Sequence, residues 1–202
     1  MPIRLSLLSD YDACLAKAKK VVSEGGLFAY PTDTHYGIGC DALSEEAVER
    51  VYSAKLRERG KPLQVIVSDF AMLREYCEID VKRKKTLVEL LPGPYAFILP
   101  LKKRLPVSGN FEVGVRVPEH AFARQVCSEL GMPIVTTSAN LSGGRGVAEA
   151  RELPRAVVEA VDLVVDGGRC KYGQGSTVID LIRMKVLRRG AVREGDKIEW
   201  AD

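Results

Sequence analysis

The sequence contains few of the residues that most often hold transition metals. Only two of its 202 residues are histidines, His35 and His120. Its five cysteines lie far apart, their number is odd and none forms a CxxC pair, a pattern that argues against a zinc knuckle or a redox motif. We expect no metal ligated by the protein itself. The cysteines are expected to be reduced and mostly buried as small hydrophobic residues.

Long apolar segments are also absent. No apolar run approaches the ~18 residues that a membrane span requires, and segment 1–8 is too short for a secretory signal. We therefore expect a cytoplasmic protein without membrane association. Apolar residues make up 46% of the chain and charged residues 28%, which excludes a disordered, collagen-like or coiled-coil protein. At roughly 150 residues per domain, the length predicts a single domain over residues 1–202.

Three common motifs of nucleotide-binding or hydrolytic sites are missing. The chain has no GxxxxGK[ST] phosphate loop, no GxGxxG dinucleotide fingerprint and no GxSxG nucleophile elbow. His35 beside Asp33 could act as a base, although a loop histidine without a catalytic role is the commoner case. These absences favour a site made of hydroxyls and cations, which positions and neutralises phosphates while the substrates supply the nucleophile.

The net charge of +3 says little about partners, but one stretch is strongly basic. Between residues 81 and 104 seven cations face one acid, Glu89. Such a run could attract a polyanion. A solvated helix face and a charged loop explain it equally simply, and we favour that interpretation. The cations are Lys82, Arg83, Lys84, Lys85, Lys102, Lys103 and Arg104.

Helical and strand patterns alternate along the chain, which predicts an α/β protein. Helices are expected at 9–24 with Ser9 as the N-cap, from Ser44 onward, at 82–91, at 119–130 ended by Gly131, and around 149–161 near Pro154. Short turns join the last strands, so a mixed sheet is favoured over a purely parallel one. Strands are expected at 27–30, 63–67, 95–99, 113–117, 134–137, 164–165, 177–182 and 185–187.

Small polar residues, glycines and cations gather in five clusters beside these strands, the usual place for binding sites in α/β proteins. Residues 55–62 hold four cations, which suit phosphate, although a helix C-terminus alone also favours cations. Residues 135–144 place hydroxyls and an amide after a buried strand, a donor-rich arrangement that suits an anion. The remaining clusters lie at 31–39, 173–177 and 187–190.

At these clusters the chain resembles the YrdC/TsaC family of threonylcarbamoyl-adenylate synthases, over nearly its whole length and in order. Seven segments carry the resemblance: PTDTHYGIGCDA, AKLRERGKPL, PGPYAFIL, VGVRVPEH, TTSANLSG, GSTVIDL and LRRGAV. The resemblance implies an open, twisted, mostly mixed β-sheet flanked by helices, with a large basic cavity. It implies the single-domain form of the family.

The resemblance also implies an activity. Family members combine L-threonine, bicarbonate and ATP, with Mg2+ brought by the nucleotide, into threonylcarbamoyl-AMP and pyrophosphate. The product feeds the N6-threonylcarbamoyladenosine modification of tRNA, and a separate complex transfers the group. We expect the same substrates and the same downstream partner here.

By position in the matching motifs, the resemblance assigns residues to two ligands. Threonine would be held by Thr34, Arg116, Thr136 and Ser176. A guanidinium such as that of Arg116 suits a carboxylate, because the two pair through parallel hydrogen bonds. Lys55 and Arg57 would be the catalytic cations, offsetting the charge that grows on pyrophosphate. ATP would be held by Lys55, Arg57, Lys61, Ser138, Asn140 and Arg188.

Five positions depart from the family pattern. Glu58 replaces a proline, Ala96 a threonine, and Glu112 a common hydroxyl. Ile66 stands where the longer family form has a histidine, and His35 replaces an apolar residue.

Two other functions stay open at this point. A non-catalytic or YciO-like protein could use the cavity and the basic run to bind nucleotides or double-stranded RNA, with strong salt dependence. Carbamoyl-adenylate chemistry, as in related domains of hydrogenase maturation factors, is disfavoured because their companion domains are absent. We rank the synthase first.

Overall fold

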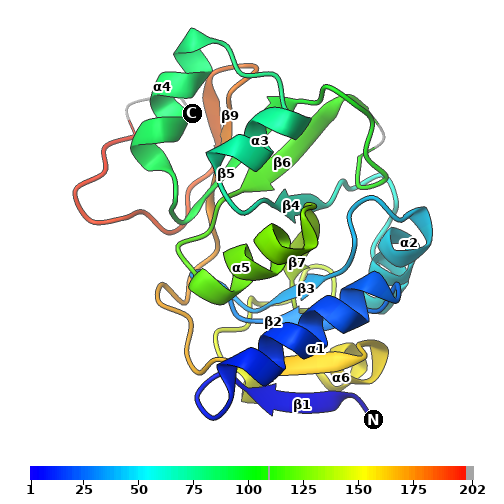
Figure 1. Ribbon diagram of the computed structural model, residues 1–202. Helices are drawn as coiled ribbons and strands as arrows, with labels where there is room; N and C mark the ends of the chain where they lie inside the picture. Colours follow the sequence, from blue (N-terminus) through cyan, green and yellow to red (C-terminus); the bar gives the residue numbers. More distant parts are fainter. Residues whose placement is uncertain (109, 199–202) are drawn as a thin grey trace.

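The computed structural model describes residues 1–108 and 110–198, so the end of the expected span 1–202 lies outside it. Within these residues ten strands form one sheet, in the order β1-β8-β2-β3-β7-β4-β6-β5-β9-β10 (Figure 1). The strands are β1 Ile3–Ser6, β2 Phe28–Tyr30, β3 Gly37–Gly39, β4 Gln64–Ile66, β5 Tyr95–Pro100, β6 Glu112–Arg116, β7 Ile134–Ser138, β8 Leu163–Asp166, β9 Thr177–Asp180 and β10 Lys185–Arg188.

The sheet is mixed, which confirms the expected class. Strand β8 runs parallel to both β1 and β2, and the pairs β4–β6 and β5–β9 are also parallel. The centre is antiparallel, because β7 lies between β3 and β4 and opposes both. The helices are α1 Tyr11–Ser23, α2 Glu45–Ala54, α3 Phe70–Tyr76, α4 Val81–Leu90, α5 Ala121–Leu130, the 3-10 helix η1 Ala150–Glu152 and α6 Arg155–Ala160.

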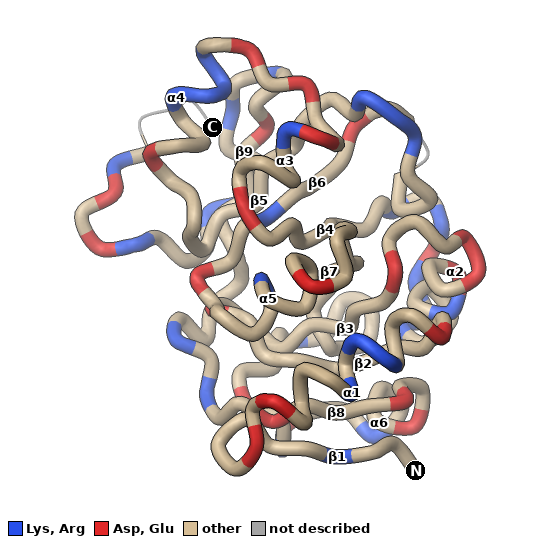
Figure 2. The backbone as a smooth tube through the Cα atoms, in the orientation of Figure 1, with Lys and Arg blue, Asp and Glu red and all other residues tan. Residues whose placement is uncertain are grey.

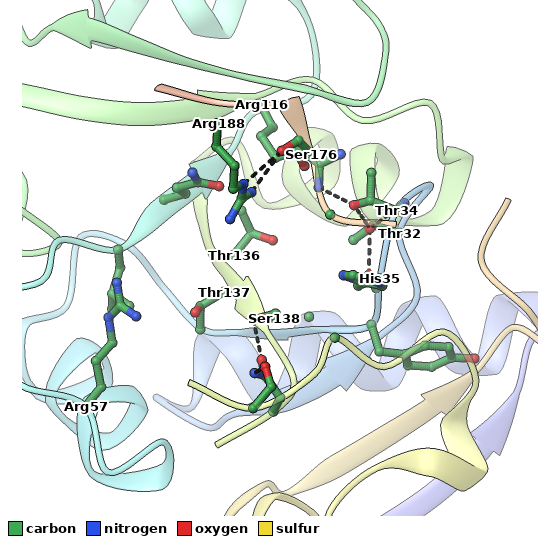
Figure 3. Close-up of a pocket in the computed structure, with 18 of the residues that line it drawn as sticks. Thr32, Thr34, His35, Arg57, Arg116, Thr136, Thr137, Ser138, Ser176 and Arg188 are labelled. Atoms are coloured by element: carbon green, nitrogen blue, oxygen red, sulfur yellow. Dashed lines mark hydrogen bonds between the residues drawn. The ribbon is translucent and has the colours of Figure 1, made fainter. Parts of the chain in front are cut away.

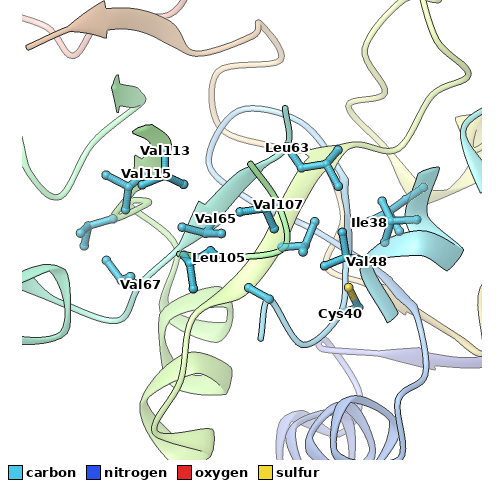
Figure 4. Packing of buried hydrophobic residues seen from close by; sticks show 14 of the residues in the cluster. Ile38, Cys40, Val48, Leu63, Val65, Val67, Leu105, Val107, Val113 and Val115 are labelled. Atoms are coloured by element: carbon cyan, nitrogen blue, oxygen red, sulfur yellow. The ribbon is translucent and has the colours of Figure 1, made fainter. Parts of the chain in front are cut away.

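Alternating side chains bury both faces of the sheet. In β4, Val65 packs into one core cluster and Ile66 into the other, as the two-residue period of a strand requires. Helices α1 and α5 contact each other and cover the face that holds Ile66. The opposite cluster joins β3, β4 and β6 to α2 and to Leu105 and Val107 (Figure 4). Each strand at the centre is therefore fixed from both sides.

Capping side chains set the helix starts. Ser44 caps α2 by accepting a hydrogen bond from the Ala47 amide, as expected. The expected N-cap Ser9 is wrong by one residue, because Asp10 accepts from the Ala13 amide and begins α1. His120 caps α5, where its side chain accepts a hydrogen bond from the Ala123 amide.

Several elements differ from the expected ones. Strands β1 and β3 and helix α3 were not anticipated, and Gly37–Gly39 lies inside a segment interpreted as a loop. The helix expected at 149–161 is divided, since Pro154 occupies the N-cap of α6 after η1. Proline lacks the amide hydrogen that a continuous helix would use there.

The basic run does not present seven free cations. Lys102 donates to the Arg74 carbonyl, Lys103 pairs with Glu75, and Arg83 pairs with Asp80. Lys and Arg alternate with Asp and Glu over the molecule (Figure 2). These contacts support the solvated-face interpretation.

The cysteines were expected to be mostly buried, and this is confirmed: all five side chains are buried and free. Burial raises the pKa of the Cys77 thiol to about 12, which keeps it protonated at neutral pH. Across 1–108 and 110–198, no helix is both long and apolar enough to cross a membrane.

Candidate active site

The five clusters converge on one cavity of about 290 Å³ beside the centre of the sheet. Figure 3 shows its walls: Arg57 on one side, Thr34 and His35 on the other, Arg188 and Arg116 above, and Ser138 below. Eight of the ten expected ligand residues line it. They are Thr34, Arg57, Arg116, Thr136, Ser138, Asn140, Ser176 and Arg188.

The lining is cationic and rich in hydroxyls. Three guanidinium groups reach the cavity, and none of the described residues that line it is an aspartate or a glutamate. Hydroxyls come from Thr32, Thr34, Thr136, Thr137, Ser138 and Ser176. Converging cations and neutral donors stabilise negative charge in a cleft. Such a lining favours an anionic ligand.

Arg116 lies at the end of β6 and is only 4% exposed. It donates to the Asp33 carboxylate at 2.6 Å and to the Thr34 hydroxyl at 2.9 Å. The other Asp33 oxygen accepts from the Glu119 amide at 3.0 Å. Among the residues that the structure describes, none is hydrogen-bonded to the buried Arg116 Nε. The guanidinium is thus held rigidly with donor capacity left for a ligand.

Thr32 organises the segment that carries Thr34 and His35. Its hydroxyl donates to the His35 carbonyl at 2.7 Å and accepts from the Thr34 amide at 3.2 Å. This closes a tight turn directly after β2 and directs the Thr34 hydroxyl toward Arg116. The turn therefore fixes one wall of the cavity.

The end of α2 directs Lys55 and Arg57 to different places. The Leu56 amide bonds to the Ser53 carbonyl and the Arg57 amide to the Tyr52 carbonyl, the two bonds of a Schellman ending. Leu56 adopts a positive φ of 50° at the position where glycine is usual. The left-handed residue turns the chain, so Arg57 reaches the cavity wall while Lys55 does not.

Lys55 is buried behind the cavity rather than in it. Its ammonium donates to the carbonyls of Ser138 and Asn140, the second at 2.6 Å. Burial, together with a smaller effect of the nearby Arg57 charge, lowers the pKa of Lys55 from its ordinary value to about 8. Lys55 therefore joins the end of α2 to the loop after β7.

That loop is closed by its own side chains. The Ser138 hydroxyl donates to the Asn140 side-chain oxygen. The Asn140 amide nitrogen donates to the carbonyls of Leu141 and Gly144, at 3.0 and 2.5 Å. The loop is held by these bonds together with those from Lys55, so Ser138 and Asn140 meet the cavity in one fixed arrangement.

Arg188 approaches from the end of β10. It donates to the Ser176 carbonyl from Nε at 3.2 Å and from Nη2 at 2.9 Å. Burial lowers the pKa of Arg188, and the adjacent Arg116 charge acts in the same direction. Arg116 is paired with Asp33, whereas Arg188 donates to the Ser176 carbonyl, so an anion beside Arg188 would lower the repulsion between the two guanidinium groups.

Gly190 permits the close approach that holds Arg188 and Ser176 together. A Cβ at position 190 would lie 2.0 Å from the Gly175 carbonyl oxygen and 2.7 Å from the Ser176 backbone. We expect Gly190→Ala to lower the free energy of unfolding by about 1–3 kcal/mol, as overpacking does, and to weaken anion binding. Chemical denaturation and calorimetry with pyrophosphate would measure both effects.

The matched control is Gly60→Ala. A Cβ at Gly60 would meet nothing within 4 Å, and its backbone lies outside the left-handed region. We expect its stability to change by less than about 1 kcal/mol. Equal effects of the two substitutions would show that the close approach at Gly190 is unimportant.

Lys61 stands apart from the cavity walls. Its ammonium pairs with Glu58 at 3.1 Å, and both side chains are exposed. Of the five positions that depart from the family pattern, His35 lines the cavity. Glu112 pairs with Arg183, while Ile66 and Ala96 are fully buried.

Sequence reasoning missed four residues that build the site. Asp33 anchors Arg116, Thr32 holds the turn, and Gln64 and Thr137 line the cavity. Asp33, Thr32 and Thr137 lie in clusters that were identified, although no role was assigned to them, because a long-range ion pair leaves no local signal. Gln64 interrupts an apolar strand segment, which is a usable sign of a polar face.

The fold and this site define an α/β protein with a cationic, hydroxyl-lined cavity for an anion. The family model Sua5_yciO_yrdC, described as telomere recombination, matches residues 20–190, and the chain belongs to that family. A threonylcarbamoyl-AMP synthase of Chromobacterium violaceum is 36% identical over 176 residues, which are 85% of this chain and 91% of the relative.

Two solved structures are similar throughout the shared region. Sua5 of P. abyssi, solved in complex with L-threonine, matches with a TM-score of 0.87 and 31% identity over 94% of this chain. The chain spans 57% of the length of that protein. YciO of E. coli matches with a TM-score of 0.84 and 26% identity, covering 96% of this chain and 98% of its own.

Proposed function

We propose that this protein is an L-threonylcarbamoyladenylate synthase, which makes threonylcarbamoyl-AMP and pyrophosphate from L-threonine, bicarbonate and ATP. The observation that carries the proposal is the acid-free cavity, where three guanidinium groups and several hydroxyls converge. The family and a curated relative of that name support the same chemistry. No acid or base on the protein is required where the reactants are neutralised and aligned.

The threonine end of the site is the Arg116 side. Thr34, Arg116, Thr136 and Ser176 place hydroxyls and a guanidinium around one part of the cavity. Arg116 is fixed by Asp33 and Thr34, so it meets a carboxylate without having to be ordered first. A P. abyssi Sua5 structure in complex with L-threonine supports an amino-acid ligand for this fold.

The nucleotide end extends from Arg188 toward Arg57, with Ser138 and Asn140 beneath. The threonine amine and bicarbonate would form a carbamate with loss of water. One carbamate oxygen would then attack the α-phosphorus, and pyrophosphate would leave as the bond to the β-phosphate oxygen breaks. Arg57 and the Mg2+ carried by ATP would offset the charge on that leaving group. Lys55 would act from behind the Ser138–Asn140 loop, and Lys61 would approach from the exposed rim.

Mg2+ enters this proposal as part of the nucleotide substrate. Across residues 1–108 and 110–198 no group of three or more His, Cys, Asp or Glu side chains could hold an ion. A resident metal is therefore not part of the proposed mechanism.

The remaining parts of the proposal follow from the product. We place the protein in the cytoplasm, where residues 1–202 act as one unit, and a tRNA-modifying complex would consume threonylcarbamoyl-AMP. Direct contact with tRNA is not required by the cavity chemistry.

A pyrophosphate-release assay tests the substrate set. We expect release that requires threonine, bicarbonate and Mg-ATP together, and that Arg57→Ala lowers by about 100-fold, because losing a charge-assisted contact costs about 2–5 kcal/mol. Arg59→Ala is the control, since Arg59 pairs with Glu49 and is exposed. Release that continues without threonine would contradict the proposal.

A further inference from the structure

His35 is the histidine of the cavity, and its place there has no part in the mechanism above. Its ring lies on the wall formed by the segment after β2, as Figure 3 shows. The Thr32 hydroxyl donates a hydrogen bond of 2.7 Å to the His35 carbonyl and so fixes the backbone of His35. The ring is half-buried and therefore faces both the protein and the ligand space.

Gly146 makes room for the ring, and Gly175 lies beside it. A Cβ at Gly146 would lie 2.1 Å from the His35 Cε1, so a larger residue there would displace the imidazole. A Cβ at Gly175 would lie 3.8 Å from the same atom and 3.7 Å from Arg188 Nη2. His35 and Arg188 therefore flank one spot in the cavity.

The charges that face His35 are positive. They are Arg116 at the end of β6, Arg188 at the end of β10, and Arg145 in the loop after β7. The carboxylate of its own segment, Asp33, pairs with Arg116. On the neighbouring 170–175 loop, Lys171 pairs with Glu119, and the Gly173 backbone accepts a hydrogen bond from the ring.

These surroundings favour the neutral form of the ring. Burial lowers the pKa of His35, the three arginines lower it further, and the bond to the Gly173 backbone opposes both effects. An oxyanion placed between Arg188 and His35 would reverse the sign of the local field. An opposite charge within about 4–6 Å typically moves a pKa by 1–3 units.

We propose that His35 contacts the oxyanion of a bound substrate and takes up a proton when that substrate enters the cavity. The inference rests on the proposed function for the identity of the substrates, whose oxyanions are the threonine carboxylate and the ATP phosphates. The protonated ring would add one hydrogen-bond donor and one positive charge to those of the neighbouring arginines, and it would do so only while the anion is bound. Substrate affinity then increases as the pH falls toward 6.

Because the chain has only two histidines, NMR titration reports each ring separately. His35→Gln assigns the signals, and His120 is the internal control because it caps α5. The titration is run on free protein, with L-threonine, with a non-hydrolysable Mg-ATP analogue and with inorganic pyrophosphate. We expect at least one ligand to raise the pKa of His35 by one unit or more, with little change at His120.

Calorimetry supplies the second readout. A shift of one unit corresponds to a gain in affinity of up to about tenfold, reached in full only below the pKa of the free ring, so wild type should gain more affinity than His35→Gln between pH 8 and pH 6. The ligand that raises the pKa of His35 shows which oxyanion it contacts: L-threonine indicates a carboxylate, and the ATP analogue or pyrophosphate indicates a phosphate. Ligands that bind without moving the His35 titration overturn the inference and leave the proposed function standing.

If threonine and the ATP analogue both fail to bind, the proposed function fails. The pyrophosphate arm then decides the inference alone. A His35 titration unchanged in pyrophosphate overturns it, and a raised pKa supports an oxyanion site of another function.

Discussion

Replacing Arg116 by methionine is expected to lower kcat/KM by about 100-fold or more and the free energy of unfolding by about 3–5 kcal/mol. The stability loss follows because the Asp33 carboxylate, which is fully buried, would lose the guanidinium 2.6 Å away. Removing one partner of a buried ion pair leaves an uncompensated charge. The activity loss follows because each 1.4 kcal/mol of binding is about tenfold. Chemical denaturation and threonine-dependent turnover measure the two effects.

A double variant separates these effects. Arg116→Met combined with Asp33→Leu removes both buried charges, and replacing a whole buried pair by apolar residues is often neutral for stability. We expect stability near wild type and turnover still lost. Recovery of turnover in the double variant would show that Arg116 serves the fold alone. Arg59→Met, at an exposed pair with Glu49, should change stability by less than about 1 kcal/mol.

Lys55→Met is the second substitution with a large expected effect. It is expected to lower turnover strongly while changing the free energy of unfolding only a little. Turnover should fall by about 100-fold, because the Ser138–Asn140 loop loses its anchor and the site loses a charge. Stability should change by no more than about 2 kcal/mol. The loss of hydrogen bonds to two carbonyls, about 0.5–1.5 kcal/mol each, is offset by removing a buried ammonium whose pKa is lowered to about 8. Lys84→Met, on the exposed face of α4, is the control.

The same pKa gives the reaction an alkaline limit. The ammonium form of Lys55 holds the loop, and its fraction falls as the pH rises through about 8. We therefore expect kcat/KM to decrease above pH 8 in wild type. Deprotonation of the threonine amine acts in the opposite direction, so it cannot imitate this decrease. Lys55→Arg should move the limit to higher pH, since arginine stays charged; identical profiles would contradict the assignment.

Local signals predicted most helices and strands and all five clusters of the site. Ser44 and Gly131 marked helix ends correctly because capping depends on a few neighbouring atoms. Strand β3 was missed because Gly-Ile-Gly has little intrinsic strand preference, and its pairing with β2 and β7 supplies the structure. Its existence depends on residues about 100 positions away in the chain.

Lys55 shows the limit of reading the site from sequence. Lys55 and Arg57 look alike as cations two residues apart, and the sequence placed both on the ligand. Leu56 separates them by adopting a left-handed backbone that non-glycine residues uncommonly take. The long-range pair of Arg116 with Asp33 is likewise set by tertiary structure, since the partners are 83 positions apart in the sequence.

The most direct test of the central claim is detection of the product itself. The protein is incubated with L-threonine, 13C-bicarbonate, ATP and Mg2+, and threonylcarbamoyl-AMP is sought by mass spectrometry. The account predicts an adenylate that is one mass unit heavier with the labelled bicarbonate and absent when threonine is omitted. No such adenylate from folded protein that binds ATP would contradict the synthase assignment.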